Sequence, residues 1–323
     1  MKNFPRGLAF AALAFCVLVL GACRDVAHGS ASTVEYDFRC EPVADDPNAV
    51  SIVDFNPSNE LLDLVVPSEL RGKKVVAIGE KAFAYCESLS SISFPDGVTT
   101  IGASAFWGCK SLVSISLPEG VTTIGDRAFF GCESLSSISL PESVTTIGED
   151  AFWGCKSLKS ISLPDGVTTI GDRAFAGCRL LSSISLPEGV TTIGDGAFYW
   201  CSSLNSISLP EGATTIGDRA FLGCNSLSSI SLPESVTTIG NWAFYGCSSL
   251  SSISLPDSVT TIGDGAFARC ASLRSISLPE GVTTIGEDAF LGVPKTCVFS
   301  VVVGSYASRW ARENGFRVET REE

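Results

Sequence analysis

The residues of this chain best suited to chemistry are its thirteen cysteines, most of which recur at a fixed step. The recurring set is Cys86, Cys109, Cys132, Cys155, Cys178, Cys201, Cys224, Cys247 and Cys270. If successive copies stack, neighbouring thiols lie within bridging distance, which leaves a disulfide ladder open. However, nine is odd, a uniform ladder favours no pairing, and a straight row of thiols cannot surround a metal ion tetrahedrally. We therefore predict reduced cysteines that pack as small apolar side chains, with no metal and no cofactor.

Catalysis has few other candidates. The only histidine, His28, lies outside the recurring segments, so no Ser-His-Asp or Cys-His arrangement can be assembled on them. Acidic residues are abundant, but one column of them repeats along the chain: Asp96, Glu119, Glu142, Asp165, Glu188, Glu211, Glu234, Asp257 and Glu280. Catalytic carboxylate pairs are single, local and held in a cleft. We expect a solvated acidic edge, with weak divalent-cation binding as the alternative, and no enzymatic activity.

Aromatic residues form a more informative column, because they vary from copy to copy. The position after a repeated phenylalanine reads Ala84, Trp107, Phe130, Trp153, Ala176, Tyr199, Leu222, Tyr245, Ala268 and Leu291, with Trp200 and Trp242 nearby. If the rings lie on the outside they form a stripe of the kind that marks partner sites. Alternatively, they pack over the groove between turns. The candidate ligand-binding residues are Trp107, Phe130, Trp153, Tyr199, Trp200, Trp242 and Tyr245.

A second variable column flanks a serine-rich segment and carries sparse charges. It contains Lys159 and Arg274 among serine, valine and asparagine residues. These two basic residues are further candidates for ligand binding, since they would give a partner its register on an otherwise uniform face. The same face is equally consistent with an inert spacer.

The element that must position all these residues is a repeat. Its phenylalanines recur every 23 residues without a gap: Phe83, Phe106, Phe129, Phe152, Phe175, Phe198, Phe221, Phe244, Phe267 and Phe290. One unit is too short to bury its apolar side chains alone, but stacked units share a continuous core. The sequence therefore predicts a solenoid with one turn per repeat and equivalent residues about 4.8 Å apart, the spacing of parallel strands.

Within each turn, the alternation in Ser91-Ile92-Ser93 predicts a short strand that builds the main sheet, with isoleucine inward. Pro95 should end that strand because it has no N–H to donate. We expect Gly102 to adopt a conformation that other residues resist. The aspartates Asp126, Asp172, Asp195, Asp218 and Asp264 are expected to cap a short helical turn that carries Ala-Phe.

The whole unit reads Leu-x-x-Ile-x-Phe/Leu-Pro-x-x-Val-x-x-Ile-Gly-x-x-Ala-Phe-x-x-Cys and resembles the treponemal-type, BspA-like leucine-rich repeats from about Leu64 to Gly292. This resemblance implies an α/β-type leucine-rich-repeat solenoid, a right-handed coil with a parallel sheet of short strands. Solenoids need atypical ends, so we predict an N-terminal cap over residues 36–63, a solenoid over 64–297 and a C-terminal cap over 298–323. The last includes a helix from about Ser305 to Asn314, stopped by Gly315.

The N-terminal residues predict export and anchoring. Lys2 and Arg6 precede an apolar run from Leu8 to Leu20 that is too short to span a bilayer. Leu20-Gly21-Ala22-Cys23 resembles a bacterial lipobox, so we expect residues 1–22 to be a lipoprotein signal peptide, Cys23 to be lipidated, and residues 23–35 to be a tether. An ordinary secretory signal with an incidental Cys23 is the alternative.

These observations restrict the classes of function that the chain can have. A net charge of −13 argues against nucleic acid or a bare anionic membrane as a partner. We expect a non-enzymatic surface protein, lipid-anchored to the bacterial envelope at the outer membrane or cell surface, that binds other proteins. The resemblance implies adhesion to host extracellular-matrix or neighbouring-cell proteins. The alternatives are a structural envelope spacer without a specific ligand, and recognition of an ordered lattice such as a glycan.

Overall fold

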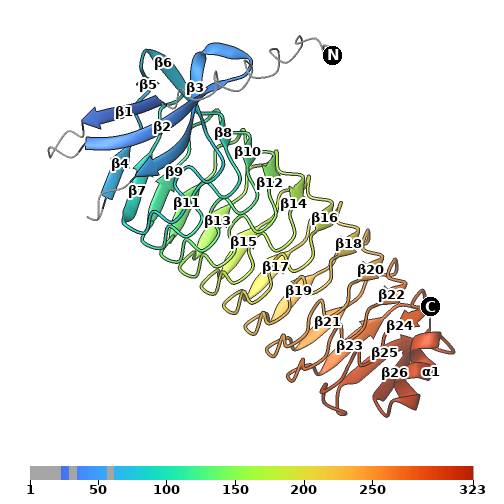
Figure 1. The fold of residues 1–323 in the computed structure, drawn as a ribbon. Helices are drawn as coiled ribbons and strands as arrows, with labels where there is room; N and C mark the ends of the chain where they lie inside the picture. The colour runs from blue at the N-terminus through green and yellow to red at the C-terminus, as the bar shows by residue number, and fades with distance from the viewer. Residues whose placement is uncertain (1–22, 29–34, 57–61, 323) are drawn as a thin grey trace, which may run out of the picture.

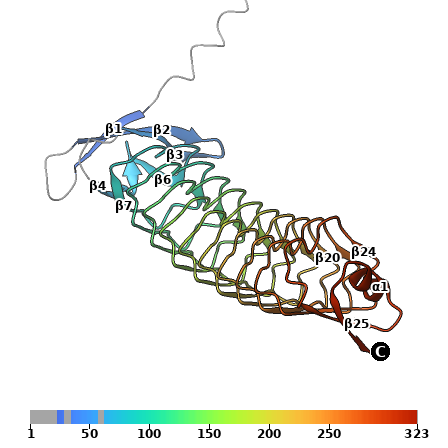
Figure 2. The same cartoon turned by 90° about the horizontal axis from the view of Figure 1, so that it is seen from below.

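The structure, a computed structural model, describes residues 23–28, 35–56 and 62–322. The predicted signal peptide lies outside these ranges. The chain coils into an elongated solenoid of about 12 parallel-sheet turns, with its ends at opposite poles of the coil (Figure 1). Viewed from below, successive turns stack side by side along one axis (Figure 2). The predicted fold class, a leucine-rich-repeat solenoid with a parallel sheet, is confirmed.

The longest sheet is built from two-residue Thr-Ile strands, which the sequence did not single out. Equivalent residues pair in parallel, for example Ile101 with Ile124. Its parallel strands beyond β3 (Asp46–Asn56) are β6 (Lys73–Ile78), β8 (Thr100–Ile101), β10 (Thr123–Ile124), β12 (Thr146–Ile147), β14 (Thr169–Ile170), β16 (Thr192–Ile193), β18 (Thr215–Ile216), β20 (Thr238–Ile239), β22 (Thr261–Ile262) and β24 (Thr284–Ile285). Near the N-terminal end, β5 (Glu69–Leu70) pairs antiparallel with β6. Two residues are too few to show the alternation by which a strand is recognised.

The Ser-Ile-Ser segments form strands as predicted, with isoleucine buried and serine outward. They do not form one main sheet. Five of them join β4 (Leu62–Val65) in the first sheet: β7 (Leu89–Ser93), β9 (Ser114–Ser116), β11 (Ser137–Ser139), β13 (Ser160–Ser162) and β15 (Ser183–Ser185). Two more, β17 (Ser206–Ser208) and β19 (Ser229–Ser231), form a pair, and β21 (Ser252–Ser254) and β23 (Ser275–Leu278) lie in a C-terminal sheet with β25 (Val298–Val302) and β26 (Arg317–Arg321).

The segment that carries Ala-Phe is a run of turns rather than the helical turn that the sequence predicted. Alternate residues bond locally and across turns: the Ala105 N–H donates to the Gly102 carbonyl (3.2 Å), whereas the Phe106 N–H donates to the Ala128 carbonyl of the next repeat (2.8 Å). Because every second N–H is used between repeats, a continuous helix cannot form here. The α-helix found within the described ranges is α1 (Tyr306–Glu313).

Gly102 is required by close approach and not, as expected, by an unusual backbone conformation. A Cβ placed on it would lie 2.7 Å from the carbonyl carbon of Gly79 in the preceding turn. The left-handed positions lie elsewhere in the repeat, one immediately before Ala-Phe and one immediately before the cysteine. Gly108 (φ 72°) and Gly131 (φ 70°) occupy the second of them.

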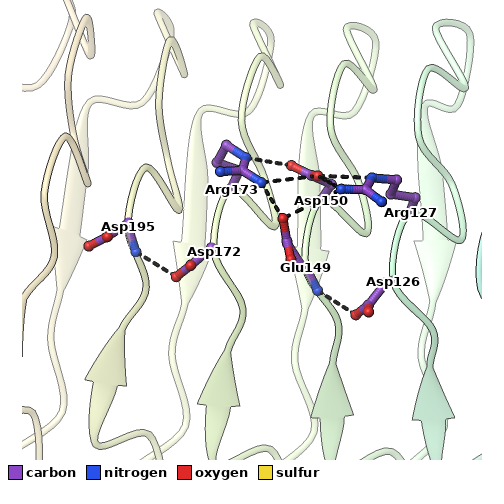
Figure 3. A network of polar contacts seen from close by, with 7 residues as sticks. All are labelled: Asp126, Arg127, Glu149, Asp150, Asp172, Arg173 and Asp195. Atoms are coloured by element: carbon purple, nitrogen blue, oxygen red, sulfur yellow. Dashed lines mark hydrogen bonds and ion pairs between the residues drawn. The ribbon is translucent and has the colours of Figure 1, made fainter.

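The aspartate column caps the next repeat rather than its own turn. Asp126 Oδ1 accepts the backbone N–H of Glu149 (2.9 Å), and Asp172 Oδ1 accepts that of Asp195 (2.9 Å), as Figure 3 shows. Each acceptor stands 23 residues before its donor, so these hydrogen bonds run along the solenoid axis. The expectation of an intra-turn cap was wrong because the donors at this position are satisfied between repeats.

The interior is a stack of identical rings bordered by the cysteine column. The repeated phenylalanines lie 5.2–5.7 Å apart between ring centroids, with planes within 12° of parallel. Each repeat cysteine from Cys109 to Cys270 donates its thiol to the carbonyl of a phenylalanine in the preceding repeat, for example Cys132 Sγ to Phe106 O at 3.1 Å. The predicted burial of the repeat cysteines is confirmed.

Burial also changes the acidity of these thiols. It raises the pKa of Cys86 and of Cys270 to about 12, from an ordinary value near 9. It likewise raises the pKa of Cys178 and Cys224. The folded thiols therefore stay protonated well above neutral pH, which makes them poor nucleophiles and poor metal ligands.

Stability should therefore fall in alkali. An unfolded thiol ionises near pH 9 and a folded one near pH 12, so unfolding releases protons in this window. Each such cysteine stabilises the fold fully below about pH 9, and this contribution declines by about 1.4 kcal/mol per pH unit above it. We expect a melting temperature that is flat between about pH 7 and 8.5 and drops steeply towards pH 11. Cys178→Ala should lower the number of protons released on unfolding by about one; a flat alkaline profile would contradict the expectation.

The N-terminal end is a ribbon of antiparallel strands, β1 (Cys23–His28), β2 (Glu35–Val43) and β3 (Asp46–Asn56). β3 pairs in parallel with β6, which joins the ribbon to the long sheet. Phe38 and Phe55 extend the ring stack, since Phe55 lies 5.2 Å from Phe83. Part of the predicted tether is instead a strand, because the backbone of β1 pairs with that of β2 along its whole length.

The C-terminal end covers the last turn with aromatic side chains. Ser305 accepts the backbone N–H of Ser308 (3.1 Å) as the N-cap of α1, and Gly315 follows the helix with φ 74°. Phe299 and Trp310 pack on Phe290, the last ring of the repeat stack, at 5.0 and 5.3 Å. These side chains therefore shield the C-terminal end of the core from solvent.

Candidate functional site

The aromatic side chains that follow the core phenylalanines form a second, outer column. Ring centroids of Tyr85 and Trp107 lie 5.6 Å apart, those of Trp107 and Phe130 5.5 Å, and those of Phe130 and Trp153 5.6 Å. These rings lie outside the phenylalanine core, and Trp107, Phe130 and Trp153 are each half-buried. Both interpretations of the column therefore hold in part: each ring packs on its neighbour across the groove between turns and keeps some surface exposed.

The outer column is interrupted at Ala176, which is fully buried. Beyond it, Tyr199 and Trp200 meet edge to face at 6.2 Å. Trp242 and Tyr245 are instead covered by guanidinium groups, those of Arg219 at 4.7 Å and Arg269 at 5.4 Å. The structure thus divides the predicted aromatic residues into three groups rather than one stripe.

Two hollows lie beside the interruption. One, of about 280 Å³, is lined by Trp153, Arg173, Asp195, Gly196, Tyr199, Asp218 and Arg219. The other, of about 290 Å³, is lined by Trp153, Gly177, Arg179, Tyr199 and Trp200. The rings of Trp153 and Tyr199 border both. The arginines and glycines of this site were not singled out from the sequence, although their positions also vary from repeat to repeat.

One candidate residue, Trp200, has an unfavourable backbone conformation. Trp200 has φ 58° at the left-handed position before the cysteine, where seven of the ten repeats carry glycine. A left-handed conformation costs a non-glycine residue about 1–2 kcal/mol. The indole packs against Gly223 of the next turn, where a Cβ would lie 3.3 Å from the ring, and its residue remains 45% exposed.

A charged network includes Arg173, which also lines the first hollow. Figure 3 shows the side chains of this network. Asp150 is buried and accepts hydrogen bonds from Arg127 Nε (3.1 Å) and Arg173 Nε (2.8 Å), on the turns before and after it. Both arginines also pair with Glu149. The hydrogen bond with Asp150 is the main cause that raises the pKa of Arg173. The network links three successive repeats and fixes Arg173 beside Trp153.

Removing the charge of Asp150 should loosen these three turns. We expect Asp150→Asn to lower the free energy of unfolding by about 1–2 kcal/mol, because two arginines lose a charged acceptor while asparagine tolerates the left-handed φ of 55°. Asp288→Asn is the matched control, since Asp288 has the same φ but is exposed. The control should change stability by less than about 0.5 kcal/mol. Equal effects of the two substitutions in denaturant titrations would contradict the role of the network.

The serine face lies on another segment of each turn. Lys159 and Arg274 are exposed there but stand five repeats apart, so the structure does not bring them together. The backbone of this column is hydrogen bonded from turn to turn, as between Ser182 N–H and the Lys159 carbonyl (3.1 Å). Two isolated charges on a uniform surface do not define a site.

The remaining candidates are the residues of the acidic column. The acidic column is exposed along its length, as expected of a solvated edge. Three of its members, with Arg321, border a hollow of about 780 Å³ near the C-terminal end. Within the part of the chain that the structure describes, no group of three or more His, Cys, Asp or Glu residues is placed to hold a metal ion. Nor does any helix in those ranges have the length and apolarity needed to cross a membrane.

Two similar solved structures are bacterial leucine-rich-repeat proteins. One from Bacteroides ovatus is 26% identical, with a TM-score of 0.61 over 88% of this chain and 98% of that one. A leucine rich cell surface protein from Faecalibacterium prausnitzii is 27% identical, with a TM-score of 0.59 over 88% of this chain and 93% of that one. No curated protein sequence matches this chain significantly.

The sequence profile of the BspA type leucine rich repeat region matches in six copies, over residues 76–205 and 191–297. Leucine-rich-repeat proteins typically bind other proteins and are generally not enzymes. The 23-residue period, the stacked phenylalanines and the Ile-Gly and Ala-Phe anchors of the matched residues all agree with this assignment. The chain therefore belongs to the BspA-type leucine-rich repeat family.

Proposed function

We propose that this chain is a non-enzymatic adhesin of the bacterial cell surface, anchored through a lipid on Cys23, that binds a host extracellular-matrix or neighbouring-cell protein. The lipobox-like Leu20-Gly21-Ala22-Cys23 supports the anchor, although it lies largely outside the described residues. The similar protein from Faecalibacterium prausnitzii, described as a cell surface protein, supports the location.

The observation that carries the proposal is the outer aromatic column. Its rings are held by their neighbours at 5.5–5.6 Å, so little side-chain freedom remains to be lost on binding. Tryptophan and tyrosine are enriched among the few residues that carry most of the binding energy of protein interfaces. Nothing in the packing of the core requires rings at this position, since Ala176 and Ala268 occupy it in other repeats.

Binding of purified protein that lacks residues 1–23 to immobilised matrix proteins and epithelial surfaces tests the proposal. We expect saturable binding that weakens at least thirtyfold when Trp107, Trp153 and Tyr199 are replaced together by alanine, because interface tryptophans commonly contribute about 2 kcal/mol each. A matched control replaces Ser116, Ser162 and Ser208 by alanine on the serine face and should leave binding unchanged. Failure to bind any member of a broad panel, or equal binding of both variants, would refute adhesion through this column.

A structural envelope spacer is the second candidate. The uniform serine face favours it, because such a surface offers a partner few distinguishing features. Protease treatment of intact cells separates the two functions. An adhesin on the surface is cleaved, whereas a spacer inside the envelope is protected until the outer membrane is opened.

A further inference from the structure

We propose that the two hollows beside Trp153 and Tyr199 form one docking site for a protein segment that presents an aromatic side chain next to a carboxylate. The inference rests on the proposed function, since it assumes a protein ligand, and it names the part of the outer column that recognises that ligand.

The site exists because two variable columns carry small residues on adjacent turns. In the outer column, Ala176 separates Trp153 from Tyr199. In the left-handed column before Ala-Phe, Gly196 separates Arg173 from Arg219. The resulting hollows, about 280 and 290 Å³, are each smaller than a typical small-molecule pocket of about 300–1,000 Å³. Their size suits single side chains of a larger partner.

The walls suit an aromatic ring. Trp153 and Tyr199 border both hollows, and Arg173 stacks on Trp153 at 5.8 Å. Trp200 adds a third ring on the side of the second hollow. Its unfavourable backbone conformation, at a position where most repeats have glycine, is a cost that packing alone does not explain, because glycine would avoid it. Exposing this indole beside the hollow gives the residue a binding role.

The charges favour a carboxylate on the ligand. The second hollow is bordered by the exposed Arg179 and by no acidic residue. Among the described residues Arg179 forms no ion pair, whereas Arg173 is held by Asp150 and Glu149. Acidic groups border only the first hollow, where Asp195 Oδ1 already accepts the Asp218 N–H (2.8 Å) and Asp218 Oδ1 the Asn241 N–H (2.7 Å). We therefore place the ligand's ring in the first hollow and its carboxylate at Arg179.

Binding of short end-blocked peptides to the chain without residues 1–23 tests the proposal. The probe is Gly-Asp-Tyr-Asp-Gly, compared with Gly-Lys-Tyr-Lys-Gly and Gly-Asp-Ser-Asp-Gly, and the signals are the indole N–H resonances of Trp153 and Trp200. We expect saturable shifts with the first peptide, at least fivefold weaker binding of the lysine peptide, and no shifts with the serine peptide. Equal binding of all three peptides, or none of any, would overturn the proposal.

Variants locate the binding. Gly196→Arg should fill the first hollow and weaken binding at least tenfold, at little cost in stability, because arginines occupy the equivalent left-handed positions on both sides. Asp288→Arg places the same side chain in the same column far from the site and should have no effect. Arg179→Ala should weaken binding of Gly-Asp-Tyr-Asp-Gly and leave the weaker binding of Gly-Lys-Tyr-Lys-Gly unchanged. Trp200→Gly should weaken binding tenfold while the melting temperature stays constant or rises, a combination that a merely structural tryptophan would not produce.

The outcome is separable from that of the proposed function. If matrix binding survives Gly196→Arg but is lost in the triple aromatic variant, the docking site is wrong and the adhesin proposal stands. If the acidic tyrosine peptide binds as expected but no matrix or cell-surface protein does, the docking site stands and the choice of partner is wrong. Glycan binding that Gly196→Arg abolishes, with no peptide binding, would replace the protein segment by a carbohydrate.

Discussion

Gly171→Ala is expected to destabilise the solenoid by about 3 kcal/mol, even though it adds a single methyl group. The new Cβ would lie 2.8 Å from the carbonyl carbon and oxygen of Gly148 and 2.9 Å from the N–H nitrogen of Glu149. All three are backbone atoms of the preceding turn, so no side chain can move aside. Relief requires the two turns to separate, which weakens the hydrogen bonds and ring stacking between them.

Two other glycines distinguish close approach from backbone conformation. Gly131→Ala should cost about 1 kcal/mol through its φ of 70°, because a Cβ there meets nothing closer than 3.9 Å. Gly166→Ala should change stability by less than about 0.5 kcal/mol, since its nearest contact is 3.4 Å and Ser143 occupies the equivalent position one repeat earlier. Denaturant titrations of the three variants measure the order of their effects on the free energy of unfolding. A cost for Gly171→Ala no larger than that for Gly131→Ala would show that the turns separate easily.

Phe175→Ala should cost about 3–5 kcal/mol, the range for removing a buried aromatic side chain. The ring is fully buried and stacks on Phe152 at 5.4 Å and on Phe198 at 5.7 Å. The cavity would lie in the middle of the stack, where each turn is stabilised only by its two neighbours. We therefore also expect loss of a single cooperative transition, with the two halves of the solenoid melting separately.

The outer column supplies the control for this prediction. Phe130→Ala removes the same atoms from a half-buried ring and should cost no more than about 1.5 kcal/mol, while unfolding remains cooperative. Calorimetry on both variants measures the enthalpy and the number of transitions. Similar costs for Phe175→Ala and Phe130→Ala would mean that the inner stack is not the main source of stability between turns.

Only part of the candidate site could be predicted from the sequence. Trp153, Tyr199 and Trp200 were selected because their column varies between repeats, and the structure places them around shared hollows. Gly196 and Arg179, which shape those hollows, were missed. The hollows depend on small residues in two different columns on adjacent turns, and only a known register between the columns reveals that they lie together.

The solenoid, its period, its buried rings and cysteines, and its exposed acidic edge follow from the amino-acid sequence, because a strict 23-residue repeat leaves stacking as the way to bury the same side chains in every unit. How the turns are joined depends on contacts that form only in the folded chain. The aspartates bond to the next repeat, Gly102 is needed for contact with the preceding turn, and a sheet of Thr-Ile strands runs beside the serine strands. These features lie between repeats, where partners are 22 to 26 residues apart, so local sequence patterns carry no signal of them.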